Sequence, residues 1–251
     1  MRKKFAFLSC VISILFCSSF VFAEEVTDGT SFQIFGQIGI GYSHNPDMSD
    51  WTKWLADDLA DDLNNIVGSN SFKSDNTPAN VAFGGELEPR LFIGSVGFGA
   101  AGGFYTVKAE SKVESKSWSD SATYSLRLNV IPIAGTLYYR KAMSDSGYLV
   151  FGAGAGYYMA TMKAEIEDKV SIGPDFNNSM TLKNTAIGYH AKIEYNHLLS
   201  GSAIIYGGLL GRYVEFDKFE KNGVWLINKN GSDLTAGLTG LSVYLGLGLI
   251  I

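Results

Sequence analysis

The most restrictive feature of this sequence is the strict alternation of two kinds of side chain along single segments. In TAIGYHAKIEYN, residues 185–196, the odd positions are mostly apolar or aromatic, whereas the even positions include His190, Lys192 and Glu194. A period of two is typical of a β-strand, whose successive side chains point to opposite faces. In a soluble sandwich the apolar face would form the core and the charged face would meet water. The pattern along the rest of the chain tests whether the fold is such a soluble sandwich.

Alternating segments of this kind recur eight times along the chain. They span residues 31–43, 80–92, 95–107, 121–140, 147–163, 182–197, 202–216 and 237–251. Segment 147–163 is apolar on both parities, so its two faces cannot be assigned from the sequence. In segment 121–140 the parity is lost near Pro132, which cannot donate to a strand ladder and therefore predicts a β-bulge.

The connections between these segments alternate between short and long. The short ones are residues 93–94, 141–146 and 198–201, and the long polar ones are 44–79, 108–120, 164–181 and 217–235. An up-and-down barrel crossing the bacterial outer membrane has this pattern, with short periplasmic turns and long outer loops. Greek-key sandwiches have no reason to sort their loops in this way. The sequence therefore predicts an all-β fold, an eight-stranded antiparallel up-and-down transmembrane barrel.

The polar parity of the strands predicts the contents of the lumen. Lipid offers no hydrogen bonds, so the outer face must be apolar, while a narrow interior is filled by side chains that can pair there. The predicted polar lumen network consists of Gln33, Gln37, Glu86, Glu88, Arg90, Arg127, His190, Lys192, Glu194 and Arg212. Such a network is either the ordinary filling of a barrel or a closed gate. Aromatic girdles at the two membrane interfaces are expected from Tyr42, Tyr148, Tyr189, Tyr195 and Tyr213.

The N-terminus predicts export. Residues 1–23 combine a basic start, an apolar run and a small residue at Ala23, which is typical of a secretory signal peptide. Residues 24–251 then form one barrel domain, and both cysteines fall inside the signal. A mature chain without cysteine suits the envelope of a Gram-negative bacterium, and we expect Sec-dependent export, cleavage near Ala23 and insertion into the outer membrane.

Charge and histidine spacing argue against several kinds of chemistry. Loss of three basic residues with the signal changes the formal net charge from −5 to −8, so nucleic acid is not an expected partner. The histidines His44, His190 and His197 are not spaced as ligands on one face, so we expect no metal site, no cofactor and no catalytic residue. A lipid A modifying enzyme remains an alternative, because His44 lies near Ser43 and Asp47 at the predicted outer rim.

The first long connection contains an amphipathic pattern at residues 50–69. Its apolar positions recur at helical spacing, and Ser49 or Asp50 can cap the helix while Gly68 can end it. The loop helix presents Trp51, Trp54, Leu55, Leu59 and Leu63 on one side. Two interpretations remain open: a lid packed on the barrel mouth or neighbouring loops, or a helix lying on the outer leaflet with its tryptophans as interfacial anchors.

Over its whole mature length the chain resembles the small eight-stranded outer-membrane barrels of the OmpA, OmpX and OmpW kind, in the outer-membrane β-barrel domain superfamily. The resemblance includes strand phrases such as NVIPIAGTLYYR and YLVFGAGAGYY. Its most specific part is a C-terminal insertion signal formed by Tyr244, Gly246, Leu249 and Ile251, in which Ile251 stands where Phe or Trp is usual.

The resemblance implies a monomer handled by the outer-membrane insertion machinery, in contact with outer-membrane lipid and lipopolysaccharide. It implies a non-enzymatic role in envelope integrity, surface contact or adhesion. The alternative is a porin-like narrow channel for small hydrophobic or polar solutes, as in the OmpW kind.

Overall fold

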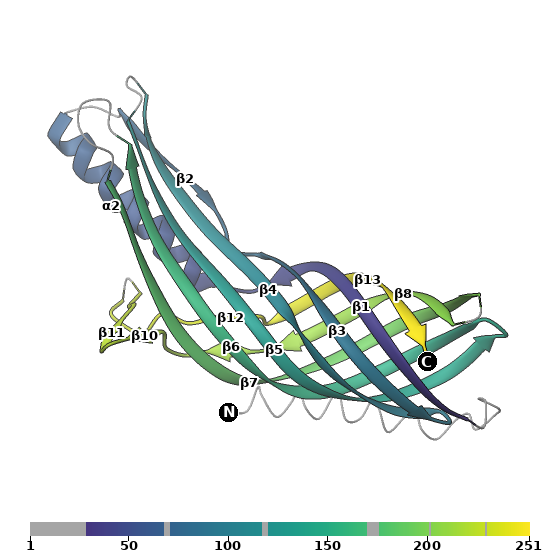
Figure 1. The fold of residues 1–251 in the computed structure, drawn as a ribbon. Coiled ribbons are helices and arrows are strands. Elements are labelled where there is room, and N and C mark those ends of the chain that lie inside the picture. The colour runs from purple at the N-terminus through teal and green to yellow at the C-terminus, as the bar shows by residue number, and fades with distance from the viewer. Residues whose placement is uncertain (1–28, 68–70, 117–119, 170–175, 201, 229) are drawn as a thin grey trace.

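The computed structural model describes residues 29–67, 71–116, 120–169, 176–200, 202–228 and 230–251. Eight antiparallel strands close into a ring in the order β1–β3–β4–β5–β6–β7–β8–β13, and the β13–β1 pairing completes it. The predicted eight-stranded barrel is therefore confirmed (Figure 1). The predicted signal peptide, residues 1–23, lies outside the described residues.

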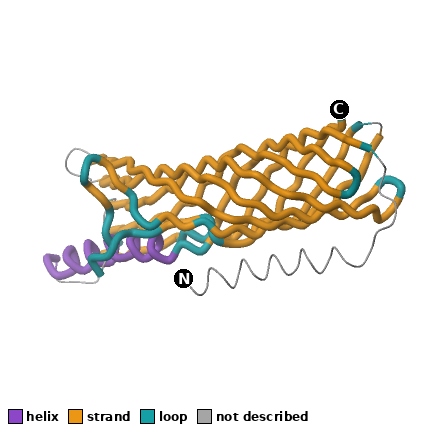
Figure 2. The backbone as a smooth tube through the Cα atoms, turned by 90° about the horizontal axis from the view of Figure 1, so that it is seen from below, coloured by secondary structure: helices purple, strands orange, loops and turns teal. Residues whose placement is uncertain are grey.

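The ring strands differ in length. Their bounds are β1 (Thr30–Ser43), β3 (Val81–Ile93), β4 (Val96–Ser115), β5 (Ser121–Ser144), β6 (Gly147–Lys169), β7 (Phe176–Ser200), β8 (Ala203–Tyr213) and β13 (Gly240–Ile250). Strands β4 to β7 continue well beyond the others, as Figures 1 and 2 show. The segments 108–120 and 164–181, expected as loops, are thus largely strand.

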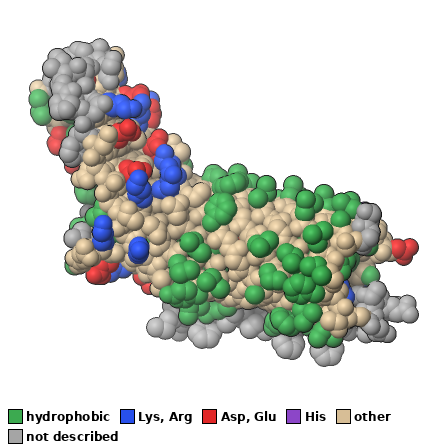
Figure 3. Space-filling view, in the orientation of Figure 1, with side chains coloured by type: hydrophobic (Ala, Val, Ile, Leu, Met, Phe, Trp, Pro, Cys, Tyr) green, Lys and Arg blue, Asp and Glu red, His purple; other side chains and the backbone are tan. Residues whose placement is uncertain are grey.

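An apolar belt surrounds the short-turn half of the barrel. Outward side chains there are large and exposed, as with Ile38 at 65% and Leu137 at 69%. Figure 3 shows this belt over the barrel and charged side chains over the strand extensions. An exposed apolar face of this extent is unfavourable in water and favourable in hydrocarbon. The belt therefore marks the part of the barrel that faces lipid.

The two faces exchange polarity above the belt. The inner side chains of the extensions form an apolar core, including Val107, Leu126, Leu128, Met162 and Leu182. The outer face of the same extensions carries ion pairs along single strands, Lys108 with Glu110 and Lys163 with Glu165. We call the extended parts of β4 to β7 with this core the platform. Its polarity is that of a protein in water, so it stands outside the bilayer.

Helix α2 (Pro46–Val67) packs against the platform's inner face. Met48 and Trp51 are buried in the same core as the platform strands, and Ala56 and Ala60 pack with Val113 of β4. The helix is therefore a lid, and burial of Trp51 contradicts the interpretation that it lies on the outer leaflet. Within the described residues no helix has the length and hydrophobicity to cross a bilayer.

The helix begins earlier than expected, because Asn45 and Pro46 provide the start. The Asn45 carbonyl accepts from Ser49 N, and Pro46 occupies the first helical position, where its missing N–H is not needed. Gly237 N donates to the Asn45 side-chain oxygen at 2.7 Å, and this bond links the start of the helix to the last loop. The predicted caps at Ser49 and Asp50 were wrong, since both residues lie inside the helix.

The last loop closes the platform from the other side. It contains the short strands β9 (Glu215–Phe216), β10 (Glu220–Lys221), β11 (Val224–Trp225) and β12 (Ala236–Gly237). β10 pairs with β7, and Phe216 and Phe219 are buried in the core that contains Trp51. A further strand, β2 (Phe72–Thr77), pairs with the extension of β4. Loops and helix together fill the concave side of the platform.

The bulge predicted at Pro132 is absent from β5. The β5–β6 register runs through Pro132 opposite Tyr158 without a shift, and the β4–β5 register is the same on both sides of it. On the side facing β4, no residue pair is formed at Pro132. Proline has no N–H to donate, so the strand can hold it where no ladder hydrogen bond is required. The register shift on this strand lies between Ala142 and Ser144 instead.

We expect Trp51→Ala to loosen the lid while leaving the barrel folded. Removing a buried tryptophan side chain costs about 3–5 kcal/mol, and here that cost falls on the platform core alone. The measurement is the rate of protease cleavage within residues 46–67 on intact membranes, which should rise. Ile66→Ala is the control, because Ile66 is 81% exposed on the same helix; equal rates in the two variants would contradict this packing.

Candidate functional site: the charged lumen

A buried ion network occupies the lumen inside the apolar belt. Arg90 donates to both carboxylate oxygens of Glu194, at 2.5 and 2.8 Å, and to Glu88 at 2.8 and 3.1 Å. Lys192 donates to Glu88 at 2.9 Å. These four side chains are at most 3% exposed. Two cations and two carboxylates give a formal charge of zero, which is the condition under which buried charges are tolerated.

The network connects two pairs of opposite strands, β3 with β7 and β5 with β13. Arg90 and Glu88 lie on β3, and their partners Glu194 and Lys192 lie on β7, four strands away around an eight-stranded ring. Tyr138 on β5 donates to Glu88 at 2.5 Å and Tyr244 on β13 donates to Glu194 at 2.9 Å, and these two strands are also four apart. Hydrogen-bonded side chains therefore cross the interior at this level.

Aromatic rings and glycines complete the packing around Arg90. Its guanidinium carbon lies 4.1 Å from the centre of the Phe35 ring and 4.4 Å from that of Tyr138, close enough for cation–π attraction. At Gly99 a Cβ atom would come 2.7 Å from the Glu88 carboxylate and 3.1 Å from Arg90 Cγ. The inner glycine at this position leaves room for the ion network.

A second, smaller network lies toward the platform. Arg212 of β8 donates to Glu86 at 2.7 Å and to the Tyr105 hydroxyl at 2.9 Å, and Gln37 donates to Glu86 at 2.7 Å. Beside it, the His190 ring shares a hydrogen bond with Thr136 at 2.8 Å. This network contains one cation and one carboxylate, so its formal charge is again zero. Above it begins the apolar core of the platform, so the interior changes from ionic to apolar within the barrel.

Most of the predicted lumen residues lie inside the barrel, and one does not. The structure brings together Gln37, Glu86, Glu88, Arg90, His190, Lys192, Glu194 and Arg212 in these two networks. Gln33 is buried nearer the short-turn end. The prediction for Arg127 was wrong: it is exposed on the outer face of the platform, because β5 has already left the bilayer there and its faces have exchanged polarity.

Sequence reasoning missed the aromatic members of the site. Tyr105, Tyr138 and Phe35 fall on the inner parity of their strands, and that parity was the signal that could have found them. Tyr244 was assigned only to the insertion signal, which stays a prediction. Tyr148, expected in a girdle, faces the lumen instead and packs beside Val150 and Phe92. Tyr42, Tyr189 and Tyr195 are exposed on the outer face.

The histidines and acidic residues that the structure describes are not grouped as metal ligands. Among the described residues no group of three or more His, Cys, Asp or Glu side chains could hold a metal ion. His44 is exposed, with Nδ1 3.4 Å from the Tyr42 hydroxyl, and Ser43 donates to the Gly237 carbonyl instead. The expectation of no cofactor and no catalytic residue stays a prediction.

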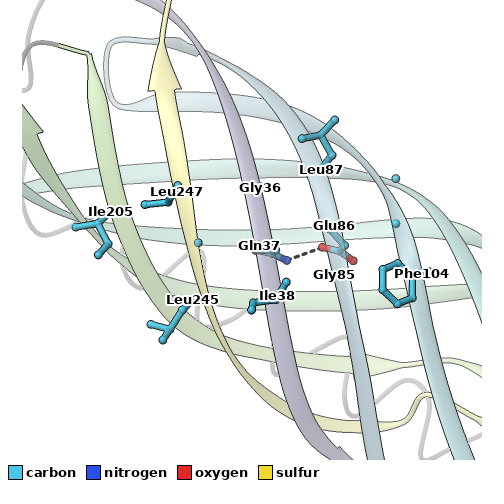
Figure 4. A pocket seen from close by; sticks show the side chains of 13 residues that line it. Gly36, Gln37, Ile38, Gly85, Glu86, Leu87, Phe104, Ile205, Leu245 and Leu247 are labelled. Carbon is cyan, nitrogen blue, oxygen red and sulfur yellow. Dashed lines mark hydrogen bonds between the residues drawn. The ribbon is translucent and has the colours of Figure 1, made fainter.

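The outer wall carries an apolar hollow of about 770 Å³ level with the lumen networks (Figure 4). The floor of the hollow is formed by small residues, Gly36 on β1 and Gly102 on β4. Its sides are formed by the larger side chains of Leu87, Leu245 and Leu247. The hydrogen bond between Gln37 and Glu86 lies on the strands that form this floor, on the lumen side. The hollow belongs to the lipid-facing belt.

Comparisons with known proteins identify the fold. No family model and no curated protein matches the sequence. The crystal structure of the outer membrane protein OprG from Pseudomonas aeruginosa matches with a TM-score of 0.50 at 10% identity, over 89% of this chain and 97% of that chain. The fold is that of a small outer-membrane β-barrel.

Two further solved structures match with lower scores. Neisserial surface protein A matches with a TM-score of 0.36 at 12% identity, over 89% of this chain and 98% of that chain. The attachment invasion locus protein Ail of Yersinia pestis, solved with a heparin analogue, matches with a TM-score of 0.32 at 10% identity. It covers 90% of this chain and 100% of that chain.

We expect Glu194→Gln to destabilise this outer-membrane barrel by about 3–5 kcal/mol, because it leaves a buried cation without its counter-charge. The matched control is Glu165→Gln in the platform, where an exposed pair with Lys163 contributes about 1 kcal/mol or less. The measurement is urea unfolding of the barrel in micelles followed by far-ultraviolet circular dichroism. Equal losses in the two variants would mean that the network contributes no more than a surface pair.

Proposed function

We propose that this outer-membrane barrel is a closed, non-enzymatic envelope protein that presents its platform at the cell surface. The observation that carries the proposal is the platform itself. It has its own buried core, made by four strand extensions, helix α2 and the last loop, and its outer face is charged. A barrel that only spanned the membrane would need none of this. Surface contact or adhesion is the role that such a supported extracellular structure serves best.

A narrow channel is the alternative, and the lumen networks argue against it. Side chains from opposite strands meet in the interior, and eight strands leave space only for such filling. We expect no stepwise current when the mature protein is inserted into planar bilayers at neutral pH. Discrete current steps in the wild type that change in size in Glu194→Gln would instead support the gated-channel interpretation.

Lipopolysaccharide is the partner we propose for the outer face of the platform. Lys108, Arg127 and Lys163 are direct cross-strand partners on β4, β5 and β6, and all three lie on the outward face. The row stands four residues beyond Phe104 of the apolar belt, which is about 13 Å along the strand. Like charges directly opposite one another repel, so a bound anion would reduce the repulsion among these three cations.

The chemistry of this row suits phosphate groups of a lipid headgroup. The Lys163 ammonium is hydrogen-bonded to Glu165 and lowers the pKa of that carboxyl. Lys108 pairs with Glu110. Arg127 forms no ion pair within the described residues. Two carboxylates facing three cations leave the row with one net positive charge. An arginine is the side chain best suited to bidentate phosphate contacts.

We expect the triple change Lys108→Gln, Arg127→Gln, Lys163→Gln to weaken retention of lipopolysaccharide, by about fivefold for each charge removed. The measurement is lipopolysaccharide phosphate that stays with the barrel through purification. The control is Lys73→Gln, Lys112→Gln, Lys169→Gln, which removes three cations nearer the platform tip that also pair with carboxylates two residues away. Equal retention in the two triple variants would refute the row as the contact.

A further inference from the structure

A pocket of about 800 Å³ opens at the short-turn end of the lumen. Its walls come from the start of β1, the end of β5, the start of β6 and the ends of β7 and β13. Leu198, Ile250 and Tyr148 line the pocket and also pack against the buried apolar clusters above it. The pocket is therefore blind. In outer-membrane barrels the short-turn end faces the periplasm.

Arg140 gives this pocket a largely buried cation that has no counter-ion among the described residues. It is only 6% exposed and lies 4.6 Å above the Phe92 ring. Its Nε donates to the Gly94 carbonyl at 2.9 Å, and Nη1 donates weakly to the Ser31 hydroxyl at 3.4 Å. A guanidinium has five donors, and among the described residues the other Arg140 donors form no further hydrogen bond.

The other buried cations of the lumen differ from Arg140 in one respect. Arg90, Lys192 and Arg212 each form an ion pair with a buried carboxylate, whereas within the described residues none forms with Arg140. The acidic residue of the pocket lining, Asp145, is exposed on the turn. Because a cation without a counter-charge is costly when it is largely removed from water, an anion bound in the pocket would stabilise Arg140.

Polar atoms without partners gather at the same end of the lumen. Gln33 is 1% exposed, and its Oε1 accepts no hydrogen bond. The Tyr148 hydroxyl and both amide atoms of Asn196, its cross-strand neighbour, are likewise unpartnered. One layer higher, the carboxylates of Glu88 and Glu194 are fully engaged. The pocket thus offers donors from Arg140 and, buried within its lining, the unpartnered Tyr148 hydroxyl and Gln33 Oε1.

We propose that this pocket binds a small oxyanion that carries its own hydroxyl donor, a ligand of the hydroxycarboxylate class. The carboxylate accepts from the remaining Arg140 donors and from Tyr148, and the ligand hydroxyl donates to Gln33 Oε1. Arginine matches the planar carboxylate with two parallel bonds. The proposal concerns the periplasmic end of the barrel and does not depend on the role of the platform.

Three matched probes test the proposal on the mature barrel in zwitterionic micelles, by two-dimensional NMR titration. Lactate carries both charge and hydroxyl, propionate lacks the hydroxyl, and lactamide lacks the charge. We expect lactate to shift the amide signals of Ser31, Gln33, Arg140 and Tyr148. Propionate should bind several-fold more weakly, and lactamide at least about tenfold more weakly, because bonds to charged groups are the stronger ones.

Variants assign the binding to the named side chains. Arg140→Gln should weaken lactate binding by about tenfold or more, while Lys112→Gln, which also removes one cation but on the outer face of the platform, should leave it unchanged. Gln33→Ala should abolish the preference for lactate over propionate. Should Arg140→Gln fail to fold, the comparison of lactate with lactamide on the wild type still decides.

Three results would overturn the proposal. The first is the absence of any lactate-induced shift, which would mean that the pocket holds water alone. The second is equal binding of lactate and lactamide, and the third is unchanged lactate binding in a folded Arg140→Gln variant. Any of these would show that Arg140 does not serve an anion in this pocket.

Discussion

The structure depends on the need to pair every backbone hydrogen-bonding group inside hydrocarbon. Eight strands meet that need by closing into a ring, and the small ring leaves an interior that side chains must fill. Polar side chains on the inner parity can fill it only if they satisfy one another. Closure brings β3 opposite β7, so that Arg90 finds Glu194 across the lumen. The ion network is thus a consequence of ring size as much as of residue type.

The second determinant is the thickness of the bilayer. Strands β4 to β7 are longer than a membrane crossing requires, so one part of each strand lies in lipid and the other part in water. Within the belt their outward side chains meet lipid; beyond it the outward side chains meet water and the inward ones become a core. Leu126 and Leu128 are therefore buried for the same reason that Arg127 is exposed. Helix α2 and the last loop cover that core, which would otherwise face water.

Alternation in the sequence was sufficient to predict the ring, the number of strands and the inward direction of Arg90, Glu194 and their neighbours. It was insufficient where the environment changes along a strand. Period two distinguishes two faces without saying which solvent each one meets, so Arg127 was placed on the wrong side. Segment 147–163 is apolar on both parities, which hid the inward direction of Tyr148. The pairing of Tyr138 with Glu88 depends on ring closure, and no local pattern encodes it.

The three levels of the interior follow different physical rules, and their order limits what the barrel can do. The platform end is apolar and covered by helix α2, and the middle is ionic, neutral and internally paired. Among the described residues, the short-turn end combines an open pocket with a cation that forms no ion pair, Arg140. A solute that enters there meets the apolar clusters around Phe35 and Phe92 and then the closed network. This order of levels favours capture of a ligand at the periplasmic mouth over its passage through the lumen.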